Sequence, residues 1–93
     1  MTGRNNTVLV TGANRGIGFE FVRQYAQKGW HVIAGTRDPE RADDLRELAA
    51  GHDAIDIEQL DVASAASIDA LVVRLEGQTI DVLINNAGIF GEF

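Results

Sequence analysis

Three glycines within seven residues, Gly12, Gly16 and Gly18, stand between two segments of different apolar pattern. The β-branched run 7–10 precedes them, and a helical spacing of apolar residues follows them. A strand that turns on glycines into a helix presents unpaired backbone N–H groups and the positive end of the helix dipole. Glycine has no Cβ, so an anion can come close to this backbone. The pattern therefore predicts a phosphate-binding turn, although a plain tight strand-to-helix turn also fits three glycines alone.

The amino-acid composition limits the kinds of ligand and partner that this chain can bind. The chain has 93 residues, which is enough for one domain over 1–93. It carries 14 Asp and Glu against 8 Lys and Arg, which argues against binding to nucleic acid or to an anionic membrane surface. There is no cysteine, and the only histidines are His31 and His52, so we expect no thiol chemistry and no metal site. We see no signal peptide or apolar run of membrane-spanning length, and expect a cytoplasmic protein.

Strand-like and helical segments alternate along the chain. Apolar runs predict strands at 7–11, 31–36, 54–60 and 80–84. Helices are predicted over 16–28, between 38 and 51, and between 64 and 77. Asp38 before Pro39 is typical of an N-cap, as is Ser64, and Gly29 suits a left-handed helix end.

Apolar spacing also predicts which face each helix buries. The expected buried residues are Ile17, Phe21 and Tyr25 in the first helix, Ala42, Leu45, Leu48 and Ala49 in the second, and Ile68, Leu71, Val72 and Leu75 in the third.

The order β-α-β-α-β-α-β predicts an α/β fold with a doubly wound, Rossmann-type parallel sheet of strand order 3-2-1-4. The strand at 54–60 begins by alternating apolar and acidic residues, which suits an edge with one wetter face. We expect the sheet to be truncated after the fourth strand.

Three separated motifs together resemble the short-chain dehydrogenase/reductase family. They are TGANRGIG at 11–18, LDV at 60–62 and IDVLINNAG at 80–88. The resemblance covers essentially the whole chain and is to the N-terminal, cofactor-binding part of the family, as in carbonyl-reductase and C-factor-like members.

The resemblance implies a role for each matching residue. The turn around the pyrophosphate would comprise Gly12, Asn14, Arg15, Gly16, Ile17 and Gly18. The Asp61 carboxylate would accept from the adenine amino group, with the Val62 backbone beside the ring. Asn85, Ala87 and Gly88 would pass along the adenosine ribose, and Asn86 would brace the central strands. Without the other motifs, Asp61 also fits a plain turn or helix-capping carboxylate.

The end of the strand at 31–36 bears on which nicotinamide cofactor the site prefers. Family members that prefer NAD usually place an acidic residue there, whereas this chain has Thr36 followed by Arg37. An arginine can clamp a 2′-phosphate through two hydrogen bonds, and Arg15 is a second cation for it. These residues favour NADP(H). NAD(H) stays the alternative, because Asp38 lies 20 residues beyond Gly18, near the spacing of the acid in NAD enzymes.

The family's reaction, hydride transfer between nicotinamide and a carbonyl or alcohol, uses a tyrosine, a lysine four residues later, a serine and an asparagine. The resemblance places all four after the third motif, and this sequence ends five residues after Gly88. Tyr25 is followed by glycine at the fourth position and is expected to pack on its helix. We therefore assign no catalytic residue here and expect no hydride transfer from these residues alone.

Two functions from different classes remain open at this level. The first is the NADP(H)-binding front part of an oxidoreductase, and the second is a stand-alone regulatory or self-associating nucleotide-binding module without catalysis. An apolar strand at 82–84 with no partner on its far side predicts a homo-oligomer, formed through that strand or through an uncovered sheet face.

Overall fold

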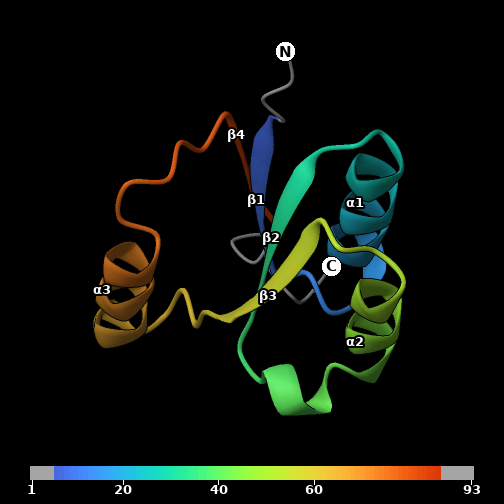
Figure 1. The fold of residues 1–93 in the computed structure, drawn as a ribbon. Coiled ribbons are helices and arrows are strands. Elements are labelled where there is room, and N and C mark those ends of the chain that lie inside the picture. Colours follow the sequence, from blue (N-terminus) through green and yellow to red (C-terminus); the bar gives the residue numbers. More distant parts are fainter. Residues whose placement is uncertain (1–5, 87–93) are drawn as a thin grey trace.

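A computed structural model describes residues 6–86 and shows four strands and three α-helices in alternation (Figure 1). The elements are β1 (Thr7–Thr11), α1 (Gly16–Gln27), β2 (His31–Thr36), the 3₁₀ turn η1 (Pro39–Arg41), α2 (Asp43–Ala50), β3 (Ile55–Gln59), α3 (Ala65–Arg74) and β4 (Val82–Asn85). Within the described residues, no helix is both long enough and apolar enough to cross a membrane.

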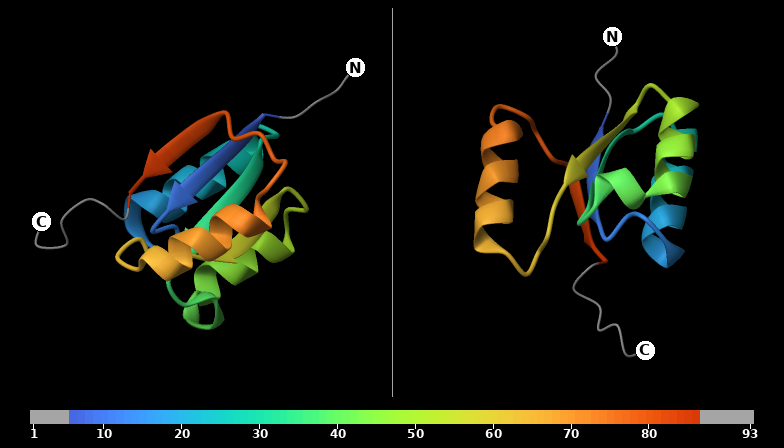
Figure 2. Two further views of the ribbon diagram at one scale, coloured as in Figure 1. Left: turned by 90° about the vertical axis from the view of Figure 1, so that its left-hand side faces the viewer. Right: turned by 90° about the horizontal axis from the view of Figure 1, so that it is seen from below.

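The four strands form one parallel sheet in the order β3-β2-β1-β4, which confirms the predicted Rossmann-type α/β fold. Helices α1 and α2 cover one face of the sheet, and α3 lies on the other face (Figure 2). In a parallel sheet the carboxyl ends of all strands lie at one edge, so this edge collects the segments that follow each strand.

The core lies between the sheet and helices α1 and α2. Its fully buried members include Val8, Val10 and Val32 of the strands, Val22 of α1 and Leu45 of α2. Central strands of a parallel sheet are covered on both faces, which explains why β1 and β2 are apolar runs rather than alternating patterns.

The predicted buried face of α1 is wrong at Ile17 and Phe21. Ile17 is 63% exposed and Phe21 is 36% exposed, while the buried stripe is Gly18, Val22 and Ala26, one residue further along. Gly18 presses the helix backbone against the turn after β1, and this approach sets the rotation of the helix about its axis.

The structure confirms that Tyr25 packs on its helix, as expected. It is half-buried, and its ring meets Trp30 edge-on at a centroid distance of 4.8 Å. The helix ends close to the predicted residue, and Gly29 takes a φ of +85°, as a glycine helix end allows.

The predicted buried face of α3 is only partly confirmed. Leu71 is buried and Leu75 is half-buried, but Ile68 and Val72 are exposed, the latter at 63%. The helix packs toward β3, and the described residues leave its side nearer β1 and β4 as an apolar groove of about 890 Å³. Helical spacing shows which residues share a face, but not whether a neighbouring element covers that face.

The segment after β2 also differs from the expectation. Asp38 makes no capping hydrogen bond with its side chain, and its carboxylate pairs instead with Arg41 at 3.4 Å. Pro39 starts a single 3₁₀ turn rather than the α-helix, which begins afresh at Asp43. The predicted apolar face of the second helix is confirmed, because Ala42 and Leu45 are buried and Leu48 and Ala49 pack against the core.

Ser64 caps α3 as predicted, and its Oγ accepts a hydrogen bond from the Ser67 N–H at 3.1 Å. Replacing Ser64 with alanine leaves that N–H without its acceptor, so we expect the free energy of unfolding to fall by about 1 kcal/mol. Urea unfolding of Ser64→Ala beside Ser64→Asp, which keeps an acceptor, measures this. A loss of the same size in both variants would contradict the capping role.

Glu20 on α1 is the residue whose carboxyl pKa departs most from the ordinary value. Hydrogen bonds from Arg23 and then Gln24 lower its pKa from 4.5 to about 2. Since the folded pKa lies below the unfolded one, the ionised pair stabilises the fold above pH 4.5, and the contribution is lost as the pH falls toward 2. We expect the stability of wild type and Glu20→Gln to converge over this range, measured by thermal unfolding. A difference that is constant with pH would contradict the assignment.

Candidate functional site

The predicted site residues that the structure describes gather at the carboxyl edge of the sheet. The turn after β1, the segment after β2, the connection after β3 and the end of β4 all meet there. The backbone N–H of Ala13 donates to the Gly35 carbonyl at 3.0 Å, and that of Leu60 donates to the Thr36 carbonyl at 2.8 Å. These bonds tie the turn after β1 to β2, and β2 to the segment after β3.

The glycine turn has the backbone that a bound anion needs. Gly12 and Gly16 both take a φ of +59°, in the region that other residues rarely adopt. Arg15 precedes α1 in an extended conformation, and its side chain does not cap the helix. No heavy atom lies within 4 Å of the position that a Gly16 Cβ would take, so the outer side of the turn is open. The first amides of α1 are thus left to water or to an anion.

Gly18 has a different part in the same turn. A Cβ on Gly18 would lie 2.2 Å from the Gly12 carbonyl oxygen and 2.7 Å from the Asn86 Nδ2. Only glycine allows α1 to approach the end of β1 this closely. Gly18 is buried, so it shapes the turn from behind, while the exposed Ile17 and Asn14 lie on its outer side.

The end of β4 holds the glycine turn in place. Asn86, which we expected to brace the central strands, donates from Nδ2 to the Gly12 carbonyl at 3.1 Å, so its bond goes to the turn after β1. Thr11 at the end of β1 donates from Oγ1 to Asn85 Oδ1 at 3.1 Å. Ala87 and Gly88, also predicted to bind the cofactor, lie outside the described residues.

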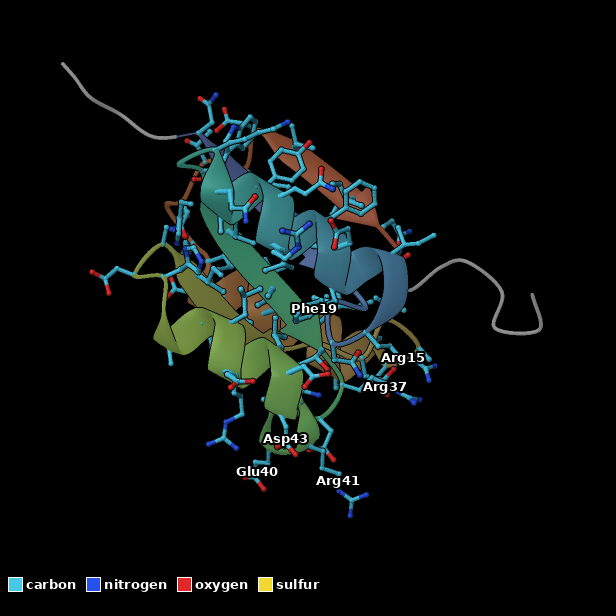
Figure 3. All side chains as sticks on the ribbon, turned by 90° about the vertical axis from the view of Figure 1, so that its right-hand side faces the viewer. Arg15, Phe19, Arg37, Glu40, Arg41 and Asp43 are labelled. Atoms are coloured by element: carbon cyan, nitrogen blue, oxygen red, sulfur yellow. The ribbon has the colours of Figure 1, made fainter. Side chains whose placement is uncertain are left out.

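Strand β2 ends at Thr36, as predicted, and Arg37 is the first residue beyond it. Thr36 is only 2% exposed, so its side chain packs inside the sheet and its backbone sets where Arg37 begins. Arg37 is exposed, and Figure 3 shows Arg15 and Arg37 at the same end of the molecule. Two cations therefore lie beside the glycine turn of a protein whose net charge is −6.

Asp61 follows β3 and makes the hydrogen bond of a turn carboxylate. This agrees with the second interpretation of its sequence position, a turn or helix-capping residue. Its Oδ1 accepts from the Ala63 N–H at 3.0 Å. Within residues 6–86, no side-chain hydrogen bond engages Oδ2, so this oxygen remains available for a ligand. Val62 is exposed beside it.

Sequence reasoning missed two polar residues near this edge, Gln59 and Ser67. Their side chains hydrogen-bond to each other at 3.0 Å, and they contact the segments of Arg37 and Asp61. No motif or periodicity marks them.

Residues 6–86 contain no cluster of three or more His, Asp or Glu side chains that could hold a metal ion.

Comparison with known proteins identifies relatives over nearly the whole chain. The family model described as short chain dehydrogenase matches residues 6–93. The chain is 42% identical over 90 residues to (−)-isopiperitenone reductase of Mentha piperita, covering 89% of this chain and 29% of that protein.

Solved structures agree with this match. Menthone neomenthol reductase from Mentha piperita superposes with a TM-score of 0.82 at 41% identity, over 94% of this chain and 33% of that one. A short-chain dehydrogenase/reductase from Burkholderia multivorans with bound NADP gives a TM-score of 0.83 at 32% identity, over 88% and 36%. The chain thus spans about a third of the length of these relatives. With the glycine turn, the strand order and a family match over residues 6–93, the chain belongs to the short-chain dehydrogenase family.

Proposed function

We propose that this chain is the NADP(H)-binding N-terminal part of a short-chain dehydrogenase/reductase. The observation that carries the proposal is the pairing of an open glycine turn with two exposed arginines, Arg15 and Arg37, at the carboxyl edge of the sheet. Ligands of open parallel sheets bind at this edge. The Burkholderia relative, which has the same fold, is described with NADP bound.

The residues present fit a dinucleotide. The outer side of the turn is open at Gly16, and the first amides of α1 would donate to the pyrophosphate. Asp61 would accept from the adenine amino group through its free Oδ2, beside Val62. Asn85, Ala87 and Gly88 would pass along the ribose, as the family resemblance implies.

The choice of NADP(H) over NAD(H) rests on the end of β2. The exposed Arg37 stands directly after the strand, where a carboxylate would be needed to bond the ribose hydroxyls of NAD(H). Asp38, the acid whose spacing from Gly18 suits that role, pairs with Arg41 at 3.4 Å. Arginine next to a 2′-phosphate makes charge-assisted, two-pronged hydrogen bonds.

The parent reaction we propose is reduction of a carbonyl or oxidation of an alcohol, for which the bound cofactor supplies or accepts the hydride. That reaction also needs a positioned proton donor. The 93 residues contain no Tyr-x-x-x-Lys, and Tyr25 packs against Trp30 on α1. Our proposal for these residues alone is therefore cofactor binding without hydride transfer.

A second candidate, a self-associating nucleotide-binding module, is favoured by the exposed apolar surface beside β4. Leu83 is 61% exposed, and the groove between α3 and the sheet is lined by Leu9, Ile68 and Val72 among others. Among the described strands, β4 pairs only with β1. We propose that this surface and the free edge of β4 pair two copies of the chain. The cytoplasmic location expected from the sequence stays a prediction.

Calorimetric titration of the purified chain with NADPH and NADH, with sedimentation of the same sample, tests both candidates. The first requires binding of NADPH that is tighter than binding of NADH. Absence of heat with either cofactor would contradict it. A monomer at micromolar concentration would contradict the proposed pairing.

A further inference from the structure

A line of polar contacts joins the two segments that would hold the adenosine end of the cofactor. Gln59, the last residue of β3, donates from Nε2 to the Arg37 carbonyl at 3.3 Å. Its Oε1 accepts from the Ser67 hydroxyl at 3.0 Å. The same hydroxyl oxygen accepts from the Asp61 N–H at 2.8 Å. The backbones of Arg37 and Asp61 are thereby connected through two side chains.

The direction of each bond is set by chemistry. A backbone N–H can only donate a hydrogen bond and a carbonyl can only accept one. The Ser67 hydroxyl must therefore accept from the Asp61 N–H and donate to the Gln59 Oε1. Gln59 then presents its amide nitrogen to the Arg37 carbonyl. A primary amide carries its donor and its acceptor on separate atoms, so Gln59 engages the Arg37 carbonyl and the Ser67 hydroxyl at the same time.

Further contacts hold the backbones of Gln59 and Ser67. Gln59 lies opposite Thr36 in the register of β3 on β2, one residue before Arg37. Arg74 of α3 donates from Nη2 to the Gln59 carbonyl at 2.9 Å. The Ser67 N–H donates to the Ser64 Oγ at the start of α3. The backbones of Gln59 and Ser67 are therefore held in place by the fold, which fixes where their side chains begin.

We infer that Gln59 and Ser67 are positioning residues, which set the spacing between the 2′-phosphate side and the adenine side of the cofactor site. This inference rests on the proposed function and adds a structural basis for cofactor preference to it. In the proposed site, Arg37 would contact the 2′-phosphate, which only NADP(H) carries, whereas Asp61 would contact the adenine that both cofactors share. Gln59 thus acts on preference, and Ser67 acts on affinity for both cofactors.

Gln59→Met removes both polar groups of this side chain at similar length and without a change of charge. We expect the Kd for NADPH to rise about five-fold, as loss of the exposed hydrogen bond to the Arg37 carbonyl implies, and the Kd for NADH to rise less than about two-fold. Ser67→Ala should raise both constants by a similar factor of about three, and Ser67→Thr, which keeps the hydroxyl, should restore them. Gln78→Met, the same replacement after α3, is the matched control.

The measurement is calorimetric titration of each variant with both cofactors, after thermal unfolding has shown that the variant folds. The ratio of the two dissociation constants is the decisive number, because a purely structural role would weaken both cofactors equally. An unchanged ratio in Gln59→Met would overturn the inference while the proposed function stands. If the wild-type chain bound neither cofactor, the proposed function and the inference would fail together.

Discussion

Replacing Gly18 with alanine is expected to lower the free energy of unfolding by about 3 kcal/mol and to abolish cofactor binding. The added Cβ would lie 2.2 Å from the Gly12 carbonyl oxygen, which is backbone and cannot rotate away. It would also meet the Asn86 Nδ2 that braces the same carbonyl. Alanine in a helix gains only about 1 kcal/mol over glycine, so the steric cost dominates.

Urea unfolding measures this effect, and Gly51→Ala is the matched control. Gly51 ends α2 at a φ of −95°, and a Cβ there would meet the Leu48 carbonyl oxygen at an ordinary 3.7 Å. We expect that variant to be as stable as wild type or more stable by up to about 1 kcal/mol. Equal stability of the two variants would show that α1 does not depend on close contact with the turn.

Replacing Arg37 with aspartate is expected to raise the Kd for NADPH about 100-fold and to change that for NADH less than about three-fold. The exposed guanidinium after β2 is the group we assign to the 2′-phosphate. Its loss removes charge-assisted hydrogen bonds, and the new carboxylate repels the phosphate. The same carboxylate can bond the ribose hydroxyls of NADH, which offsets the loss for that cofactor.

Lys28→Asp is the control for this change, because it alters the net charge by the same amount at the other end of α1. We expect it to leave both affinities within about two-fold, since exposed charges at a distance are screened by salt. Calorimetric titration of both variants with both cofactors gives the four constants needed. Similar losses of NADPH and NADH in Arg37→Asp would refute the NADP(H) assignment.

Local patterns in the sequence predicted the elements of this fold well. The bounds of β1 and β2 and the cap at Ser64 depend on the chemistry of adjacent residues, which a sequence displays directly. The order of alternating strands and helices then limits the sheet to few topologies. The glycine spacing indicated the turn because glycine takes a φ of +59°, as Gly12 and Gly16 do, without the steric cost that other residues meet there.

Local patterns failed where a contact between distant residues decides the outcome. The series beginning at Ile17 and the series beginning at Gly18 have the same four-residue spacing, so periodicity cannot choose between them. The more apolar series was the wrong one, because α1 is turned by the approach of Gly18 to Gly12. Asp38 pairs with Arg41 instead of capping, because Pro39 starts a 3₁₀ turn and not an α-helix.

By itself, the sequence determined the fold class, the strand order and the position of the glycine turn, because these follow from short-range spacing and from the geometry that glycine permits. Only the tertiary structure decided which face of α1 is buried, that Asn86 braces Gly12, and that Gln59 and Ser67 join the two sides of the candidate site. Asn86 and Gly12 are 74 residues apart. Such contacts exist only after the parallel strands have brought their carboxyl ends to one edge.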